Sequence, residues 1–160
     1  LTVEGNVLPH LLRQALAEFF VFRFDALILI PPVLQFGAAF VEGLEQDFLL
    51  LGSTDNPYPY YKQADIYVHA SRHEGKSIAI QEAMYLGCPV VLSDCSGNRE
   101  QITNGVEGVM CDLSAKSIAE HVKMLIQDES LRKNCSHAAA ARIQASEENV
   151  EMLLKICDQE

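Results

Sequence analysis

Basic residues are scarce in this 160-residue sequence, which has 12 lysines and arginines against 22 aspartates and glutamates. Binding to a nucleic-acid backbone needs clustered Lys and Arg, and a chain with a formal net charge of −10 has none to spare. We therefore expect no nucleic-acid partner. An anionic small ligand would have to be bound by a local feature, such as the amino terminus of a helix.

Long apolar runs are missing as well. The run "ALILIPPVL" is too short to span a bilayer and contains two prolines, and no charged segment precedes a small-residue cleavage site. We expect a cytoplasmic domain whose membrane contact, if it has one, is peripheral.

Cysteine pairs of the CxxC type are absent, and the number of cysteines is odd. This usage favours reduced thiols in a reducing compartment. Cys95, in the loop-like stretch "SDCSGN", is the one candidate for a reactive thiol, but no base stands in an obvious relation to it. The five are Cys88, Cys95, Cys111, Cys135 and Cys157.

Several common site signatures are also absent. The sequence has neither GxGxxG nor GxxxxGK[ST], which removes the dinucleotide and P-loop fingerprints. The stretch "HEGKS" begins like the zinc motif HExxH, but Ser77 stands where the second histidine belongs. The five histidines show no ligand spacing, and His69 at a strand end is interpreted as a packing or loop contact. We expect no metal site.

What is present is an alternation of short apolar runs and helical patterns, in a chain of ordinary globular composition with 49% hydrophobic residues. Strands are predicted at 47–52, 65–70 and 89–94, with a short helix after the first of them and a helix at 77–87 that a glycine closes. These strands are apolar throughout, which is typical of strands buried on both faces of a parallel sheet. A short helical piece at 98–103, a strand at "GVMCD" and two or three helices within 114–158 complete the pattern. We predict a doubly wound parallel α/β sheet in three layers, formed by one domain over residues 1–160.

The front of the chain is expected to continue the alternation. "LTV" would be a truncated strand, 8–20 a helix, 24–30 a strand and 32–46 a second helix.

The stretch "HEGKSIAIQE" carries two glutamates, Glu74 and Glu82, eight positions apart. In open parallel sheets, ligands bind in loops at the carboxyl ends of strands, and "SRHEGKS" is such a loop. The helix that opens near Ser77 offers unpaired N–H groups and a positive dipole end to phosphates. Gly75 would let a ligand approach the backbone, and Lys76 would either add charge or simply be solvated.

Eight residues of helix span roughly 10–12 Å. A nucleotide diphosphate sugar has hydroxyl-rich rings at its two ends and a pyrophosphate between them, so two carboxylates flanking a helix start fit it. The structural alternative is that Glu74 caps the helix and Glu82 is an ordinary charge, although Glu82 has apolar neighbours.

The segment "YYKQADIYVHASRHEGKSIAIQEAMYLGCPVVLSDCSGNREQITNGVEGVMCD" closely resembles the carboxyl-terminal, donor-binding domain of retaining glycosyltransferases of the GT-B type, group 1 (family 4). Its stretches "NPYPYYKQADIYV" and "EGKSIAIQEA" look most like bacterial enzymes that build capsular or extracellular polysaccharide. The matching positions are Ser71, Arg72, Glu74, Gly75, Glu82, Ala83, Met84, Gly87, Pro89, Val90, Gly97, Glu100, Gly105 and Gly108.

The resemblance implies a Rossmann-like fold that is one half of a GT-B architecture, and it implies a role for each matching residue. Glu74 would contact sugar hydroxyls and take part in catalysis, and Glu82 would contact the ribose. The backbone of Lys76, Ser77 and Ile78 would meet the sugar and diphosphate, with Gly75 and Arg72 completing the donor site. The loop after Gly52 would lie near the base. Transfer in this family usually needs no metal and retains the anomeric configuration.

The sequence also departs from the family pattern. The family normally has an Arg and a Lys that neutralise the leaving diphosphate, and this chain reads "EGNVLPH" in their place. Pro31 and Pro32 replace the glycine-rich turn of the family. No lysine precedes Lys62. We also expect the acceptor-binding amino-terminal domain of the family to be absent from this chain. We expect this chain to be inactive alone and to act with an acceptor-binding domain or subunit; the alternative is a non-catalytic nucleotide-sugar-binding or interaction domain.

Overall fold

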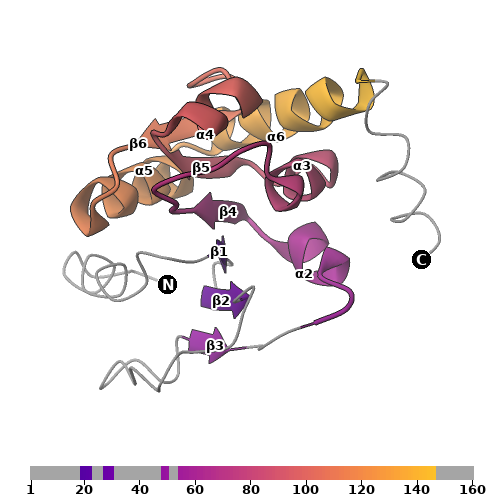
Figure 1. Cartoon of the computed structure of the whole chain (residues 1–160), viewed down its shortest axis with the longest axis horizontal. Coiled ribbons are helices and arrows are strands. Elements are labelled where there is room, and N and C mark those ends of the chain that lie inside the picture. Colours follow the sequence, from indigo (N-terminus) through magenta and orange to yellow (C-terminus); the bar gives the residue numbers. More distant parts are fainter. Residues whose placement is uncertain (1–18, 23–26, 31–47, 51–53, 147–160) are drawn as a thin grey trace.

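The structure is a computed structural model that describes residues 19–22, 27–30, 48–50 and 54–146, with side chains from residue 54 onward. Six strands form one sheet in the order β3-β2-β1-β4-β5-β6 (Figure 1). The strands are β1 (Phe19–Phe22), β2 (Leu27–Ile30), β3 (Phe48–Leu50), β4 (Ile66–His69), β5 (Val90–Ser93) and β6 (Gly108–Cys111). The helices are α2 (Tyr58–Gln63), α3 (Ile78–Tyr85), α4 (Ser96–Gln101), α5 (Ala115–Gln127) and α6 (Glu129–Gln144).

The half of the sheet that carries the candidate site is parallel, as the sequence predicts. Val68 of β4 lies opposite Val91 of β5, which in turn lies opposite Val109 of β6. Helix α3 connects the first two strands and α4 follows the second. The Rossmann-like α/β architecture is therefore confirmed, and the carboxyl ends of β4 and β5 meet at one edge of the sheet.

The other half differs from the prediction at one strand. Phe19 and Phe20, expected at the end of a helix over 8–20, belong to β1, which runs antiparallel to both β2 and β4. Four residues separate β1 from β2, too few for the crossover that parallel neighbours need. A short apolar run such as "FFVF" is also ambiguous between helix and strand. The strand predicted at 24–30 is present as Leu27–Ile30.

Some expectations fall on residues outside the described parts of the chain. These are the strand at "LTV", the helix at 32–46, residues 52–53 at the start of the loop after β3, the region beyond residue 146, most of the helix at 8–20 and the residues that replace the family's basic pair and glycine-rich turn.

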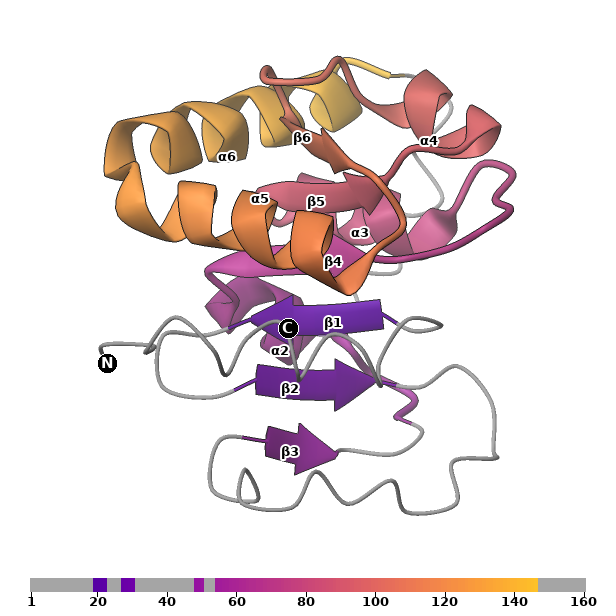
Figure 2. The ribbon, with the colours of Figure 1, turned by 90° about the vertical axis from the view of Figure 1, so that its left-hand side faces the viewer.

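The parallel strands are buried on both faces, because successive side chains alternate between two helical layers. Ile66, Val68, Val91 and Val109 pack against α5 on one face. On the other face Tyr67, Val90 and Leu92 pack against α2, α3 and the end of α6, with Ile80 and Met84 completely buried. Figure 2 shows α5 in front of the strands and α3 behind them. Within the described residues, no helix is long and apolar enough to cross a bilayer.

Helix α3 ends at a glycine, and this ending fixes the helix that carries Glu82. Gly87 has a φ of +77°, its N–H donates to the Met84 carbonyl (3.0 Å), and the Cys88 N–H donates to the Ala83 carbonyl (2.9 Å). This pair of bonds is a Schellman motif, which requires a left-handed residue at that position. The Ser136 hydroxyl of α6 donates to the Gly87 carbonyl at 2.6 Å, so the same turn ties α3 to α6.

Replacing Gly87 tests this ending. Gly87→Ala should lower the free energy of unfolding by about 1 kcal/mol, because a Cβ disfavours the left-handed conformation. Gly87→Asn is the matched control and should lose less, since asparagine tolerates that conformation better. Urea denaturation measures both, and equal losses for the two variants would contradict the assignment.

Candidate functional site

The loop that follows β4 holds Glu74 against a buried histidine. His69, the last residue of β4, is 1% exposed, and its Nε2 lies 2.7 Å from Oε1 of Glu74, whose side chain is 22% exposed. The other ring nitrogen, Nδ1, lies 3.3 Å from the Tyr67 hydroxyl. Burial lowers the pKa of His69, and the hydrogen bond and charge of Glu74 offset part of that effect. The carboxylate of Glu74 therefore hydrogen-bonds to the last residue of β4. The capping alternative would have directed it to the first-turn N–H groups of α3.

Glu82 lies on α3, half-buried, beside α2. The Tyr58 hydroxyl donates to its Oε1 at 3.1 Å. Burial and the charge of Glu82 raise the pKa of Tyr58, so the phenol stays protonated and remains a donor at neutral pH. The short helix after β3 thus supports the second glutamate of the pair.

The two glutamates share one side of the sheet. After burial and the neighbouring Tyr61 and Cys88, the charges of Glu82 and Glu74 both raise the pKa of the buried Tyr67 hydroxyl. Tyr67 also packs edge-on against Tyr61, with ring centroids 5.5 Å apart. Both carboxylates therefore lie within electrostatic reach of one buried phenol, on the side of the sheet that α3 covers.

A buried serine, Ser93 at the end of β5, joins the loop after β4 to α4. The Ser93 hydroxyl donates to the Ser71 carbonyl (2.6 Å) and accepts from the Ser71 N–H (2.9 Å). The side-chain amide of Asn98, fully buried in α4, donates to the Ser93 carbonyl at 2.7 Å. These bonds fix where the Glu74 loop begins, and sequence reasoning missed them because serine and asparagine near a strand end are also ordinary turn residues.

Gly97 brings α4 into contact with the loop after β4. A Cβ at this position would overlap the backbone carbonyl oxygens of Glu74 and Gly75, so α4 can pack against the loop only with glycine there. Gly75 is different. A Cβ there would meet no described atom within 4 Å, and positive φ values among the described residues occur at Gly87 and Gly105. In the part of the chain that is described, neither backbone strain nor packing accounts for glycine at position 75.

The amino terminus of α3 carries no side-chain cap within the described residues. Ser77 occupies the N-cap position, but its side chain accepts no N–H there, and the first turn holds no acidic residue. By contrast, Ser114 caps α5 and Asp128 caps α6 with side-chain oxygens. The first-turn N–H groups of α3 can therefore receive an anion.

The remaining predicted site residues surround this helix start. Arg72, Gly75, Lys76 and Ile78 are exposed, and Ser77 is half-buried. Ile78 keeps 67% of its surface exposed. No described contact assigns Arg72 a role, so its place in the site stays a prediction.

Of the described cysteines, Cys88, Cys111 and Cys135 are buried and Cys95 is half-buried. Cys88, Cys95, Cys111 and Cys135 form no disulfide, and burial raises the pKa of Cys111 to about 12.

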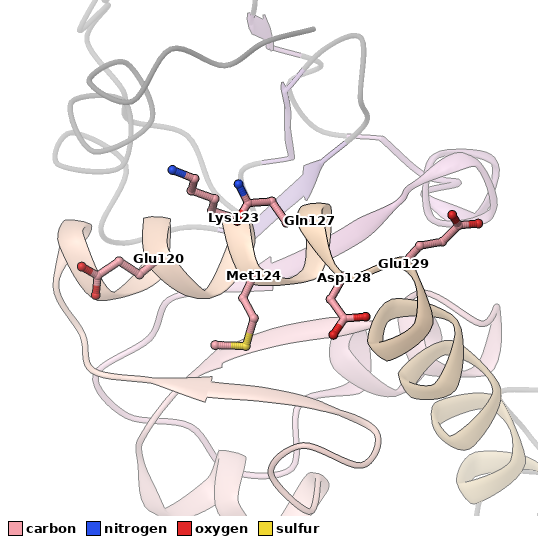
Figure 3. Close-up of a pocket in the computed structure, with 6 residues that line it drawn as sticks. All are labelled: Glu120, Lys123, Met124, Gln127, Asp128 and Glu129. Atoms are coloured by element: carbon pink, nitrogen blue, oxygen red, sulfur yellow. The ribbon is translucent and has the colours of Figure 1, made fainter.

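A surface hollow of about 630 Å³ lies away from the candidate site, along α5 and the start of α6 (Figure 3). Its lining comes from helices rather than from the loops after β4 and β5, and is made of Glu120, Lys123, Met124, Gln127, Asp128 and Glu129.

Comparison with known protein families assigns the chain to one of them. Residues 41–142 match the family described as "Glycosyl transferases group 1". The chain belongs to that family. The match includes the loop with Glu74, all of α3 and the Gly97 contact, and it confirms the resemblance stated from the sequence.

Two curated relatives are bacterial glycosyltransferases. The chain is 32% identical, over 68% of its length, to an N,N'-diacetylbacillosaminyl-diphospho-undecaprenol alpha-1,3-N-acetylgalactosaminyltransferase of Campylobacter jejuni, and covers 30% of that protein. It is 29% identical, over 62% of its length, to the capsular polysaccharide biosynthesis glycosyltransferase CapM of Staphylococcus aureus, and covers 29% of it. The chain thus spans less than a third of the length of these relatives.

Solved structures show the same fold. The carboxyl-terminal domain of a group 1 glycosyltransferase (LpcC) from Francisella tularensis superposes with a TM-score of 0.57 at 28% identity, covering 65% of this chain and 55% of that one. Anabaena HepE in complex with UDP-glucose superposes with a TM-score of 0.63 at 25% identity, covering 73% and 33%. The group 1 glycosyltransferase domain is thus supported by its fold as well as by its sequence.

The two site glycines give a matched test of loop geometry. Gly97→Ala should lower the free energy of unfolding by about 1–3 kcal/mol, because the added methyl group displaces backbone rather than a flexible side chain. Gly75→Ala should leave stability unchanged or raise it by up to about 1 kcal/mol, since it restricts the unfolded chain only. Urea denaturation measures both, and a Gly97→Ala variant as stable as the parent would show that α4 and the loop after β4 are not in contact.

Proposed function

We propose that this chain is the donor-binding domain of a retaining glycosyltransferase in polysaccharide biosynthesis, and that it binds a nucleotide diphosphate sugar. Membership of the group 1 family supports this, as do a relative that builds capsular polysaccharide and a structural neighbour that binds UDP-glucose. Because the chain spans less than a third of its relatives, we propose that transfer requires an acceptor-binding domain or subunit, and that this chain alone is inactive.

The observation that carries the proposal is the pair of half-buried glutamates on either side of the uncapped start of α3. Glu74 would accept hydrogen bonds from sugar hydroxyls and act at the reacting end of the donor. Glu82 would accept hydrogen bonds from the ribose hydroxyls while its Oε1 accepts the hydrogen bond of the Tyr58 hydroxyl. Hydrogen bonds to a charged acceptor are strong enough to select a polyhydroxylated ligand.

The pyrophosphate would lie between the two carboxylates. The N–H groups of the first turn of α3, around Ser77 and Ile78, would donate to it, and Lys76 and Arg72 would add positive charge from the loop. Open space above Gly75 would let the sugar approach the backbone. In this proposal, no metal takes part in neutralising the diphosphate.

We further propose a cytoplasmic protein whose contact with a membrane is peripheral and made through its acceptor. Free thiols at four described cysteines suit a reducing compartment. The Campylobacter relative acts, by its name, on a sugar linked to diphospho-undecaprenol, and such an acceptor would bring a transferase to a membrane surface.

A second candidate is a non-catalytic domain that binds nucleotide sugars or another protein. Two features of the sequence favour it: residues 1–61 contain no lysine, and "EGNVLPH" stands where the family typically has its basic pair. Transferase assays on the complete protein, with its acceptor-binding part, distinguish the two. Turnover of the nucleotide sugar supports the enzyme, whereas binding without turnover supports the second candidate.

Loss of the charge at Glu82 tests the binding site. Glu82→Gln keeps the shape and an oxygen for Tyr58, so stability should change little, but affinity for UDP-glucose or GDP-mannose should fall about 10-fold. Isothermal titration calorimetry with both nucleotide sugars measures the affinity, and the ligand-induced rise in Tm provides a second reading.

Glu120→Gln is the matched control, because it removes an exposed carboxylate from α5, on the opposite face of the sheet. It should leave affinity unchanged. Equal effects of the two substitutions, or no heat with either nucleotide sugar from a folded protein, would overturn the proposed function.

A further inference from the structure

His69 is a buried polar residue at the end of an apolar strand. The other members of β4 are Ile66, Tyr67 and Val68, all buried in the core. An unpaired imidazole in such a place would cost free energy, whereas an aliphatic side chain would pack without that cost. A buried pair of imidazole and carboxylate is also weak support for stability, because desolvation offsets the attraction. The fold itself therefore gives little reason for histidine at this position.

Two contacts of the imidazole, one at each ring nitrogen, define a direction. Because burial lowers the pKa of His69, its ring is neutral near pH 7 and carries one N–H. The shorter contact, 2.7 Å from Nε2 to Oε1 of Glu74, is with a carboxylate that only accepts, so Nε2 holds the hydrogen. Nδ1 then accepts from the Tyr67 hydroxyl at 3.3 Å, and burial keeps that phenol protonated by raising its pKa. Tyr67 thus orients His69, and His69 orients Glu74.

Glu74 belongs to a loop rather than to a helix or strand, and its neighbours Arg72, His73, Gly75 and Lys76 are exposed. A glutamate in such a loop samples several rotamers, and ordering it when a ligand binds costs affinity. A hydrogen bond from the rigid end of β4 removes that freedom in advance. A carboxylate has about four acceptor sites, so one bond from Nε2 leaves capacity for ligand hydroxyls.

We propose that His69 is a positioning residue for the sugar end of the donor: its Nε2–H fixes the Glu74 carboxylate in the orientation that binds the sugar hydroxyls. This inference rests on the proposed function, because it assumes that Glu74 meets the sugar. It predicts that His69 affects the affinity for the sugar part of the donor and not the affinity for the nucleotide part, since Glu82 and the start of α3 bind the nucleotide.

The test compares affinities for a nucleotide sugar and for its nucleotide alone, using UDP-glucose with UDP and GDP-mannose with GDP. In the parent chain, one of the two nucleotide sugars should bind more tightly than its nucleotide alone. The ratio of these two affinities is the sugar-dependent gain. Glu74→Gln should remove about 10-fold of that gain, and His69→Leu should remove the same amount. The double variant should lose no more than either single one, because both remove one interaction. Affinity for the nucleotide alone should stay within about 3-fold of the parent in all three.

His69→Gln is the rescue variant, since its side-chain amide places an N–H donor near the position of Nε2. It should retain most of the gain that His69→Leu loses. His121→Leu is the control, because His121 contacts the Ser117 carbonyl on α5 at 2.7 Å, on the opposite face of the sheet. It should leave both affinities unchanged.

A second measurement covers the case in which His69→Leu does not fold. ¹⁵N NMR of the imidazole in the parent chain should show the hydrogen on Nε2, and Tyr67→Phe should weaken the sugar-dependent gain several-fold without changing the affinity for nucleotide.

Three results would overturn the inference: a hydrogen on Nδ1, a His69→Leu variant with the full sugar-dependent gain, or equal losses for nucleotide and nucleotide sugar. The proposed function fails separately, if the parent chain binds neither nucleotide sugar. If Glu74→Gln loses the sugar-dependent gain and His69→Leu keeps it, the proposed function stands and the role of His69 is wrong.

Discussion

The candidate site depends on direct contact between the loop that leaves β4 and the segment at the end of β5, in which Ser93 ends the strand and Gly97 lies in α4. A glycine at position 97 allows α4 to lie against the carbonyl oxygens of Glu74 and Gly75, and the Ser93 hydroxyl bonds both backbone groups of Ser71. Parallel neighbouring strands bring these segments to one edge of the sheet, and close backbone approach then fixes their shape. The position of Glu74 and the start of α3 follow from that contact.

In the proposed function, this edge of the sheet would let a strongly acidic chain bind an anionic ligand. The site does not rely on net charge. It would combine uncapped N–H groups at the start of α3 with two carboxylates, each of which is hydrogen-bonded to a buried or half-buried aromatic side chain. Carboxylates suit the hydroxyl-rich ends of a nucleotide sugar, and the helix dipole suits its phosphates. The acidic surface elsewhere would only slow the encounter with an anion.

Much of this arrangement could be predicted from the sequence, because the signals are local. The apolar strands, the glycine after α3 and the spacing of Glu74 and Glu82 each follow from a short pattern of residues. The contacts of His69 and Gly97 could not be found in that way. Gly97 meets residues more than twenty positions earlier in the chain, and His69 differs from a core histidine only in what lies opposite its ring. Strand β1 was missed because "FFVF" continues an apolar helical pattern, and only its pairing with β2 and β4 identifies it as a strand.

The most direct test of the account is a crystal structure of the chain grown with the nucleotide sugar that it binds best. The account predicts sugar hydroxyls within hydrogen-bond distance of Glu74, the ribose at Glu82 and the pyrophosphate at the first turn of α3, with the imidazole of His69 still bonded to Glu74. Density for the nucleotide in another place, such as the hollow along α5, would contradict it.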